Sequence, residues 1–134
     1  MNAYFETVKN YLLELDFEII QEDESDGLFV VENEESGMKN VVLIVSDPIV
    51  IVEQFVFELP AENKGDIAIK LLAKNRDIIH GAFVLDEEVQ KVFFRNTHEC
   101  ENLDLNELEA TLNSLALLLS EYSTQLIEFS KQEK

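Results

Sequence analysis

The sequence has little of several residue types that mark particular protein classes. Its 134 residues include one cysteine, two prolines, four glycines and no tryptophan. The lone cysteine, Cys100, excludes a disulfide framework within the chain, and the four isolated glycines exclude a glycine-rich phosphate loop. No apolar run reaches the length that spans a bilayer. The first residues show neither the basic nor the apolar region of a signal peptide, so we expect a cytoplasmic protein.

Positive charge is also scarce. The chain has 28 acidic and 10 basic residues, which gives a formal net charge of −18. A protein of this charge repels nucleic-acid phosphates and anionic membrane surfaces, so we expect neither as a partner. Disorder is excluded because 46% of the residues are hydrophobic. A chain of this length buries roughly 68% of its unfolded surface, and we expect a single domain over residues 1–134.

The few basic residues are unevenly distributed. Residues 10–38 contain ten acidic side chains and no basic one. By contrast, one expected helix holds or borders four of the ten basic residues, and two of them, Lys70 and Lys74, share a face at i, i+4. Two interpretations stay open for the basic strip of Lys70, Lys74 and Arg76. It meets an acidic region of a second subunit or partner, or it is a solvated helix face.

Apolar periodicity predicts an α+β fold with an antiparallel sheet. Short turns join the strands, so neighbouring strands are expected to pair as a meander. The expected order is helix, three or four strands, helix, two strands, helix. In chain order we expect a helix over residues 2–15, strands over 17–22, 28–33, 41–45 and 49–59, a helix over 63–77, strands over 82–85 and 89–94, a polar loop over 96–102, and a closing helix.

The closing helix is the element that the sequence specifies best. Asp104 at the N-cap with Glu107 three residues later is a capping-box pattern, and apolar residues then recur in steps of three and four. A helix of roughly 26 residues is about 39 Å long, more than a small sheet needs for cover. It is either a long core helix or partly an interface between subunits. The residues expected to mediate self-association are Leu115, Leu119, Tyr122 and Leu126.

Catalytic and metal-binding patterns are weak. His98, Glu99 and Cys100 place a base, an acid and a nucleophile close in sequence, but triad members converge in space rather than along the chain. Two ligands fall short of the four that structural zinc takes. The acidic segment from residue 22 places Asn33 where a calcium loop needs glutamate. We therefore expect no catalytic residue, no metal and no cofactor.

Four segments carry a resemblance to a known family. They are Leu71-Leu72-Ala73-Lys74-Asn75, the glycine-led stretch from His80 to Asp86, the strand Lys91-Val92-Phe93-Phe94-Arg95, and Leu103-Asp104 with Leu108 and Leu112. The sequence thereby resembles the type III secretion chaperone-like fold, including the YbjN family and CesT/Tir-type chaperones. The turn at residues 86–88 departs from the family pattern because it lacks glycine, although Asp86 tolerates a left-handed conformation.

The resemblance implies a non-enzymatic homodimer that binds a polypeptide segment, as a chaperone or as a regulator of sensory transduction. An apolar groove or a sheet edge would receive the segment. The alternative is a small-ligand sensor with a pocket between the sheet and the closing helix. The sheet residues expected to contact a partner peptide, on a face or an edge, are Val50, Val52, Phe55 and Phe57.

Overall fold

The computed structural model describes the backbone of residues 3–130 and the side chains of residues 3–121. Its six strands form an antiparallel sheet in the order β1-β2-β3-β4-β6-β5. This α+β architecture confirms the expected order, with four strands before the middle helix. The elements are α1 (Phe5–Glu14), β1 (Glu18–Asp23), β2 (Leu28–Asn33), β3 (Met38–Ser46), β4 (Ile49–Glu58), α2 (Lys64–Asn75), β5 (Ala82–Leu85), β6 (Lys91–Glu99), η1 (Cys100–Asn102) and α3 (Leu105–Ser130).

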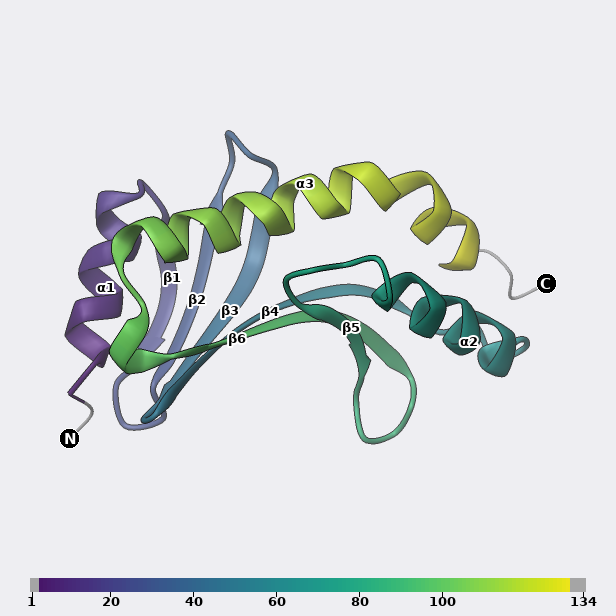
Figure 1. The fold of residues 1–134 in the computed structure, drawn as a ribbon, viewed down its shortest axis with the longest axis horizontal. Helices are drawn as coiled ribbons and strands as arrows, with labels where there is room; N and C mark the ends of the chain where they lie inside the picture. The colour runs from purple at the N-terminus through teal and green to yellow at the C-terminus, as the bar shows by residue number, and fades with distance from the viewer. Residues whose placement is uncertain (1–2, 131–134) are drawn as a thin grey trace.

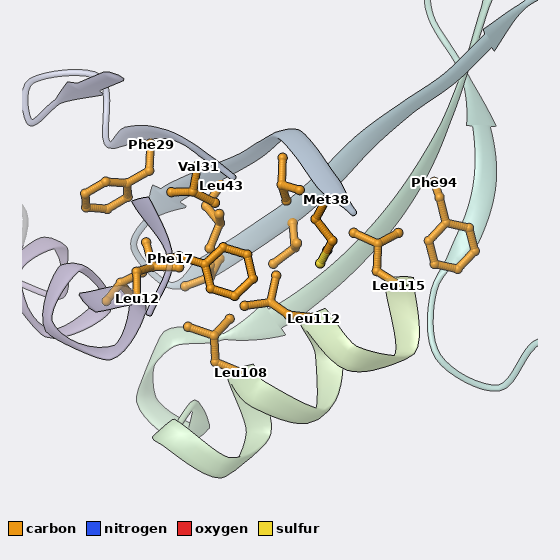
Figure 2. Packing of buried hydrophobic residues seen from close by; sticks show 14 of the residues in the cluster. Leu12, Phe17, Phe29, Val31, Met38, Leu43, Phe94, Leu108, Leu112 and Leu115 are labelled. Carbon is orange, nitrogen blue, oxygen red and sulfur yellow. The ribbon is translucent and has the colours of Figure 1, made fainter. Parts of the chain in front are cut away.

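The hydrophobic core lies on one face of the sheet, which we call the inner face. Strand side chains alternate between the two faces, and every second residue is buried on the inner face over residues 41–45 of β3 and 49–54 of β4. From α1, Phe5 stacks on Phe29 of β2 with ring centroids 4.3 Å apart. Figure 2 shows Leu108, Leu112 and Leu115 of α3 packed into the same cluster. The amphipathic faces of α1 and α3 therefore meet over the inner face.

The start of α3 is fixed as the sequence predicts. The Asp104 carboxylate accepts a hydrogen bond from the Glu107 backbone N–H at 2.7 Å, which satisfies one of the unpaired donors of the first turn. Leu103 and Leu108 on either side of the cap are both buried. From there α3 runs for 26 residues across the sheet towards the end where α2 lies (Figure 1).

The amide side chain of Asn75 ties α2 to the edge strand β5. Asn75 Oδ1 accepts from the Phe83 backbone N–H at 2.8 Å, and Asn75 Nδ2 donates to the Phe83 carbonyl at 3.2 Å. The apolar spacing of this helix predicts a buried stripe of Ile67, Leu71 and Leu72. Ile67 and Leu71 are buried, whereas Leu72 is 68% exposed, so the prediction for Leu72 is wrong. Leu72 directly follows Leu71, and one step along a helix turns the side chain away from the face that Ile67 and Leu71 share.

One further local prediction is wrong. The expected polar loop over residues 96–102 is instead the end of β6 and the turn η1, because β4 runs alongside and pairs Ile49 with Glu99.

The β5–β6 turn forms without glycine. Its left-handed residue is Val89, with φ +57°. The Asp86 carboxylate accepts hydrogen bonds from the backbone N–H groups of Lys91 and Gln90, which lower its pKa. This bonding organises the turn without glycine.

Gly81 is expected to tolerate no side chain. It adopts φ +90°, and a Cβ at this position would lie 2.6 Å from the Phe94 ring and 2.8 Å from the Arg95 carbonyl oxygen. Gly81→Ala should therefore lower the free energy of unfolding by about 2 kcal/mol or more, measured by urea denaturation.

Gly65→Ala is the matched control for this substitution. Gly65 lies in α2, and a Cβ there meets no atom within 4 Å. The control should stabilise the protein by about 0.5 kcal/mol through higher helix propensity. Equal stability of the Gly81→Ala protein and the parent would contradict the close approach of residue 81 to β6.

Candidate functional site

The face of the sheet opposite the core, which we call the outer face, is also apolar. In the described part of the chain, no helix lies over the outer side of β2, β3 and β4 (Figure 1). Valine, isoleucine, leucine and phenylalanine side chains on this face keep part of their surface in solvent, although soluble proteins rarely leave large contiguous apolar patches uncovered. We call this set the outer apolar surface: Leu28, Val30, Val42, Ile44, Ile49, Ile51, Phe55, Val84 and Phe93.

Strand register divides the outer apolar surface into two lobes. In the first lobe, Leu28 of β2 lies opposite Ile44 of β3, which lies opposite Ile51 of β4. In the second lobe, the rings of Phe55 and Phe93 meet edge to face with centroids 5.7 Å apart. Each lobe therefore presents neighbouring apolar side chains from adjacent strands as one apolar contact area.

An ion pair separates the two lobes. Arg95 of β6 lies opposite Glu53 of β4, and its guanidinium contacts the Glu53 carboxylate through two nitrogens at 2.6 and 2.7 Å. Both side chains keep solvent contact, so the pair adds little to stability. The Glu53–Arg95 ion pair therefore forms a polar site between the two apolar lobes.

The residues predicted to bind a peptide do not share one face. Val50, Val52 and Phe57 are buried in the core, whereas Phe55 is 43% exposed. Val50 and Val52 alternate with Ile51, which puts them on the inner face, and a register shift between Phe55 and Phe57 returns Phe57 to the inner side. The placement at a sheet edge is also wrong, because β4 pairs with β3 on one side and β6 on the other. Of the four, Phe55 alone belongs to the outer apolar surface.

The residues predicted for self-association likewise separate. Leu115 is 2% exposed and belongs to the core of the single chain, and Leu119 is half-buried and packs against that core. Tyr122 and Leu126 lie outside the residues whose side chains the structure describes. The described part of the stripe on α3 therefore serves the core.

A second exposed apolar surface lies on α2 and β5. Ile69 and Leu72 of α2 are 66% and 68% exposed. Leu72 and Leu85 line a shallow apolar pocket of about 270 Å³ between the two elements. Of the basic strip, Lys70 and Arg76 are exposed and Lys74 is half-buried, and all three lie in the second half of α2 or at its C-cap. We call Ile69, Leu72, Arg76 and Leu85 the α2–β5 surface.

Two depressions lie beside α3, where a small-ligand pocket was expected. One, of about 240 Å³, lies between the end of α1, the β2–β3 turn and α3, with Phe17 and Met38 among its lining. The other, of about 450 Å³, lies beside the end of β6 and the start of α3, with Arg95, His98 and Glu107 among its lining. The small-ligand sensor therefore stays a prediction.

The residues considered for catalysis do not converge. His98 Nε2 lies 2.6 Å from the Thr111 hydroxyl, where it joins β6 to α3. Cys100 is buried, and burial with the nearby Asp47 raises the pKa of its thiol, which disfavours the reactive thiolate. Among the described residues, no three His, Cys, Asp or Glu side chains are grouped to hold a metal ion.

The acidic turn considered for calcium bonds to itself. The Asp23 carboxylate accepts from the Ser25 hydroxyl at 2.7 Å and from the Asp26 backbone N–H at 3.2 Å. These hydrogen bonds, the one from Ser25 above all, lower the pKa of Asp23. This is the geometry of a β-turn between paired strands.

The outer apolar surface was missed by the sequence analysis, although the sequence carries a signal for it. The strands read Leu-Phe-Val-Val, Val-Val-Leu-Ile-Val and Ile-Val-Ile-Val, with apolar residues in both phases of the alternation. Continuous runs of this kind are typical of strands covered on both faces. Because helices cover only the inner face of these strands, the second phase stays exposed.

Comparisons with known proteins agree on the fold. A family model described as CesT_Tir_1 matches residues 1–132. The structure of YbjN from E. coli aligns with a TM-score of 0.68 at 12% identity, over 90% of this chain and 91% of that one. A sequence search of curated proteins finds no match.

Two chaperone complexes also align. SchA in the HopA1–SchA chaperone–effector complex gives a TM-score of 0.66 at 11% identity, over 90% of this chain and 94% of that one. The Yersinia pestis type III secretion chaperone SycH, solved with a fragment of YscM2, gives 0.61 at 16% identity, over 96% and 100%. These likenesses confirm the fold that the sequence motifs implied. In addition, no helix among the described residues is long and apolar enough to cross a membrane.

His98 should make stability depend on pH. Burial lowers its pKa below the ordinary value of about 6.5, nearby His80 lowers it further, and Glu107 raises it. Its cross-strand neighbour on β4 is the apolar Val50. The folded state thus binds fewer protons than the unfolded state at mildly acidic pH, and this contribution to stability is lost as pH falls below about 6.5.

The measurement compares urea denaturation of the parent and His98→Gln between neutral and mildly acidic pH. The difference in unfolding free energy between the two proteins should change across this interval, with the parent losing more stability as pH falls. His80→Gln, at an exposed position, should follow the parent more closely. Parallel curves for parent and His98→Gln would show that His98 is not linked to folding.

Proposed function

Because the chain belongs to the CesT_Tir_1 family, we propose that it is a non-enzymatic module that binds polypeptide segments. The outer apolar surface is the observation that carries this proposal. The outer face has apolar residues in two lobes, and no helix of residues 3–130 lies over it at β2–β4, so it offers area for an extended segment. Two structural neighbours are chaperones solved with polypeptide partners, which supports the same class of ligand.

The charge of the protein favours basic segments. The chain carries a formal charge of −18, and long-range attraction speeds encounter with positively charged partners. Acidic side chains also keep a protein with exposed apolar surface soluble. The preferred ligand is therefore an extended polypeptide that alternates apolar side chains with lysine or arginine.

Self-association as a homodimer is the second part of the proposal. The α2–β5 surface is exposed and has an apolar centre, and it meets the outer apolar surface at Val84, which lines the same pocket as Leu72 and Leu85. A dimer formed through it would leave the first lobe of the polypeptide site open. Action as a chaperone and action as a regulator are both compatible with this arrangement. YbjN is itself described as a proposed transcription regulator, and SycH as a secretion chaperone. We propose the cytoplasm as the compartment.

The polypeptide site is tested with an array of immobilised extended peptides that vary in apolar content and net charge. The parent protein should retain peptides that are both apolar and basic. Phe55→Gln and Ile51→Gln, which remove one apolar side chain from each lobe, should weaken binding about tenfold or more. Both substitutions leave the net charge unchanged, so the loss would report on apolar contact.

Leu117→Gln is the control for this experiment. Leu117 is an exposed apolar residue of α3, and its replacement should leave peptide binding unchanged. Circular dichroism checks that each variant is folded. Equal losses in all three variants, or no binding by the parent, would refute a polypeptide site on the outer face.

A further inference from the structure

The ion pair on the outer face stands among apolar side chains. Ile51 and Phe55 lie two residues before and after Glu53 on β4, so all three side chains share the outer face. On β6, Phe93 lies two residues before Arg95, and its ring meets that of Phe55. Ile51 belongs to the first lobe and Phe55 to the second. A segment that contacts both lobes along β4 therefore passes over the ion pair.

The ion pair uses one of the two carboxylate oxygens of Glu53. Nε and Nη2 of Arg95 both contact Oε2, at 2.7 and 2.6 Å. Within residues 3–121, whose side chains the structure describes, Glu53 Oε1 accepts no hydrogen bond. An ionised carboxylate accepts hydrogen bonds through both oxygens and donates none. Oε1 is therefore an open acceptor at the point between the lobes.

A bound segment changes the surroundings of this acceptor. The Glu53 side chain is 17% exposed and that of Arg95 is 45% exposed, so water reaches both in the free protein. A segment that covers the pair displaces this water, and the loss is costly unless new hydrogen bonds replace those to water. An apolar side chain over Glu53 offers no donor. A positively charged donor forms the strongest hydrogen bond with a carboxylate oxygen, so it is the group that fits best.

We propose that Glu53 selects the bound segment: its Oε1 accepts a hydrogen bond from a lysine or arginine that lies between two apolar side chains, one in each lobe. The inference rests on the polypeptide site of the proposed function and specifies the sequence that this site reads. Ile51 and Phe55 are four residues apart, about 13 Å along β4. An extended segment along β4 covers this distance in four residues, so the recognised basic residue has an apolar residue two positions away on each side.

An acidic side chain is the alternative occupant, because it would bond the Arg95 guanidinium. Two observations favour the basic one. Arg95 already uses two of its three guanidinium nitrogens on Glu53, whereas Glu53 Oε1 is open. The net charge of −18 also repels acidic segments before they reach the surface. Arg95 is then a positioning residue that holds the Glu53 carboxylate in one orientation.

Two synthetic peptides of identical composition test this selection. In the first, a lysine stands between two apolar residues, two positions from each. In the second, the same lysine is moved outside the apolar pair. Their net charges are equal, so long-range attraction acts on both alike. Fluorescence anisotropy should show that the parent binds the first peptide about tenfold or more tightly than the second, because the second leaves Oε1 without a donor.

Glu53→Gln should bind the two peptides equally. The glutamine oxygen keeps the hydrogen bond from Arg95, and the amide nitrogen then stands in place of Oε1, where it donates rather than accepts. Glu22→Gln is the matched control, because Glu22 of β1 is also an ion-paired glutamate, with Lys9 Nζ at 3.1 Å. It removes the same charge and should keep the preference of the parent.

The outcomes separate this inference from the proposed function. Failure of the parent to bind either peptide would overturn the polypeptide site itself. Equal binding of both peptides by the parent, a preference that survives in Glu53→Gln, or one that is also lost in Glu22→Gln would overturn the role of Glu53 alone. Circular dichroism verifies that both variants are folded.

Discussion

The rest of the structure depends on one constraint: the long helix and α1 bury only the inner face of the β2–β4 strands. Packing Phe5 against Phe29, and Leu108, Leu112 and Leu115 against the strands, removes the inner side chains from water. The strands nevertheless carry apolar residues in both phases of their alternation. Because no helix within residues 3–130 lies over the outer side of β2–β4, the protein keeps an exposed apolar surface of the kind that marks binding sites (Figure 1).

This asymmetry separates the proposed tasks in space. The outer face offers two apolar lobes around the Glu53–Arg95 pair, whereas α2 and β5 offer a second surface at the end of the sheet. The Asn75 amide fixes the second surface, since its two hydrogen bonds to Phe83 set the position of α2 against β5. The two surfaces meet at Val84, so a second copy of the chain on the α2–β5 surface would leave the first lobe of the outer apolar surface open to a polypeptide.

Charge works at two levels in this protein. The net charge of −18 repels nucleic-acid phosphates and anionic membrane surfaces, and it attracts basic polypeptide segments over a distance. The local distribution, with three of the ten cations in the second half of α2 or at its C-cap, gives this acidic protein one basic region. The acidic groups with lowered pKa values, Asp23 and Asp86, serve their own turns, because backbone and hydroxyl donors satisfy their carboxylates.

The sequence by itself determined the element order, the capped start of α3 at Asp104, the antiparallel meander and the inner core, because these follow from local periodicity and short connections. Two residues in the segments that resemble the family, Asn75 and Gly81, also help to hold α2 and β5 in place. The Asn75 amide bonds the Phe83 backbone, and residue 81 lies close against β6. It could not distinguish Val50 and Val52 from Ile51, since every residue in that run is apolar and periodicity then carries no information on facing. The tertiary structure decided this through register and the bulge near Phe57. It also decided which apolar surfaces stay open, because that depends on where the helices pack, and helix placement is a long-range property of the whole chain.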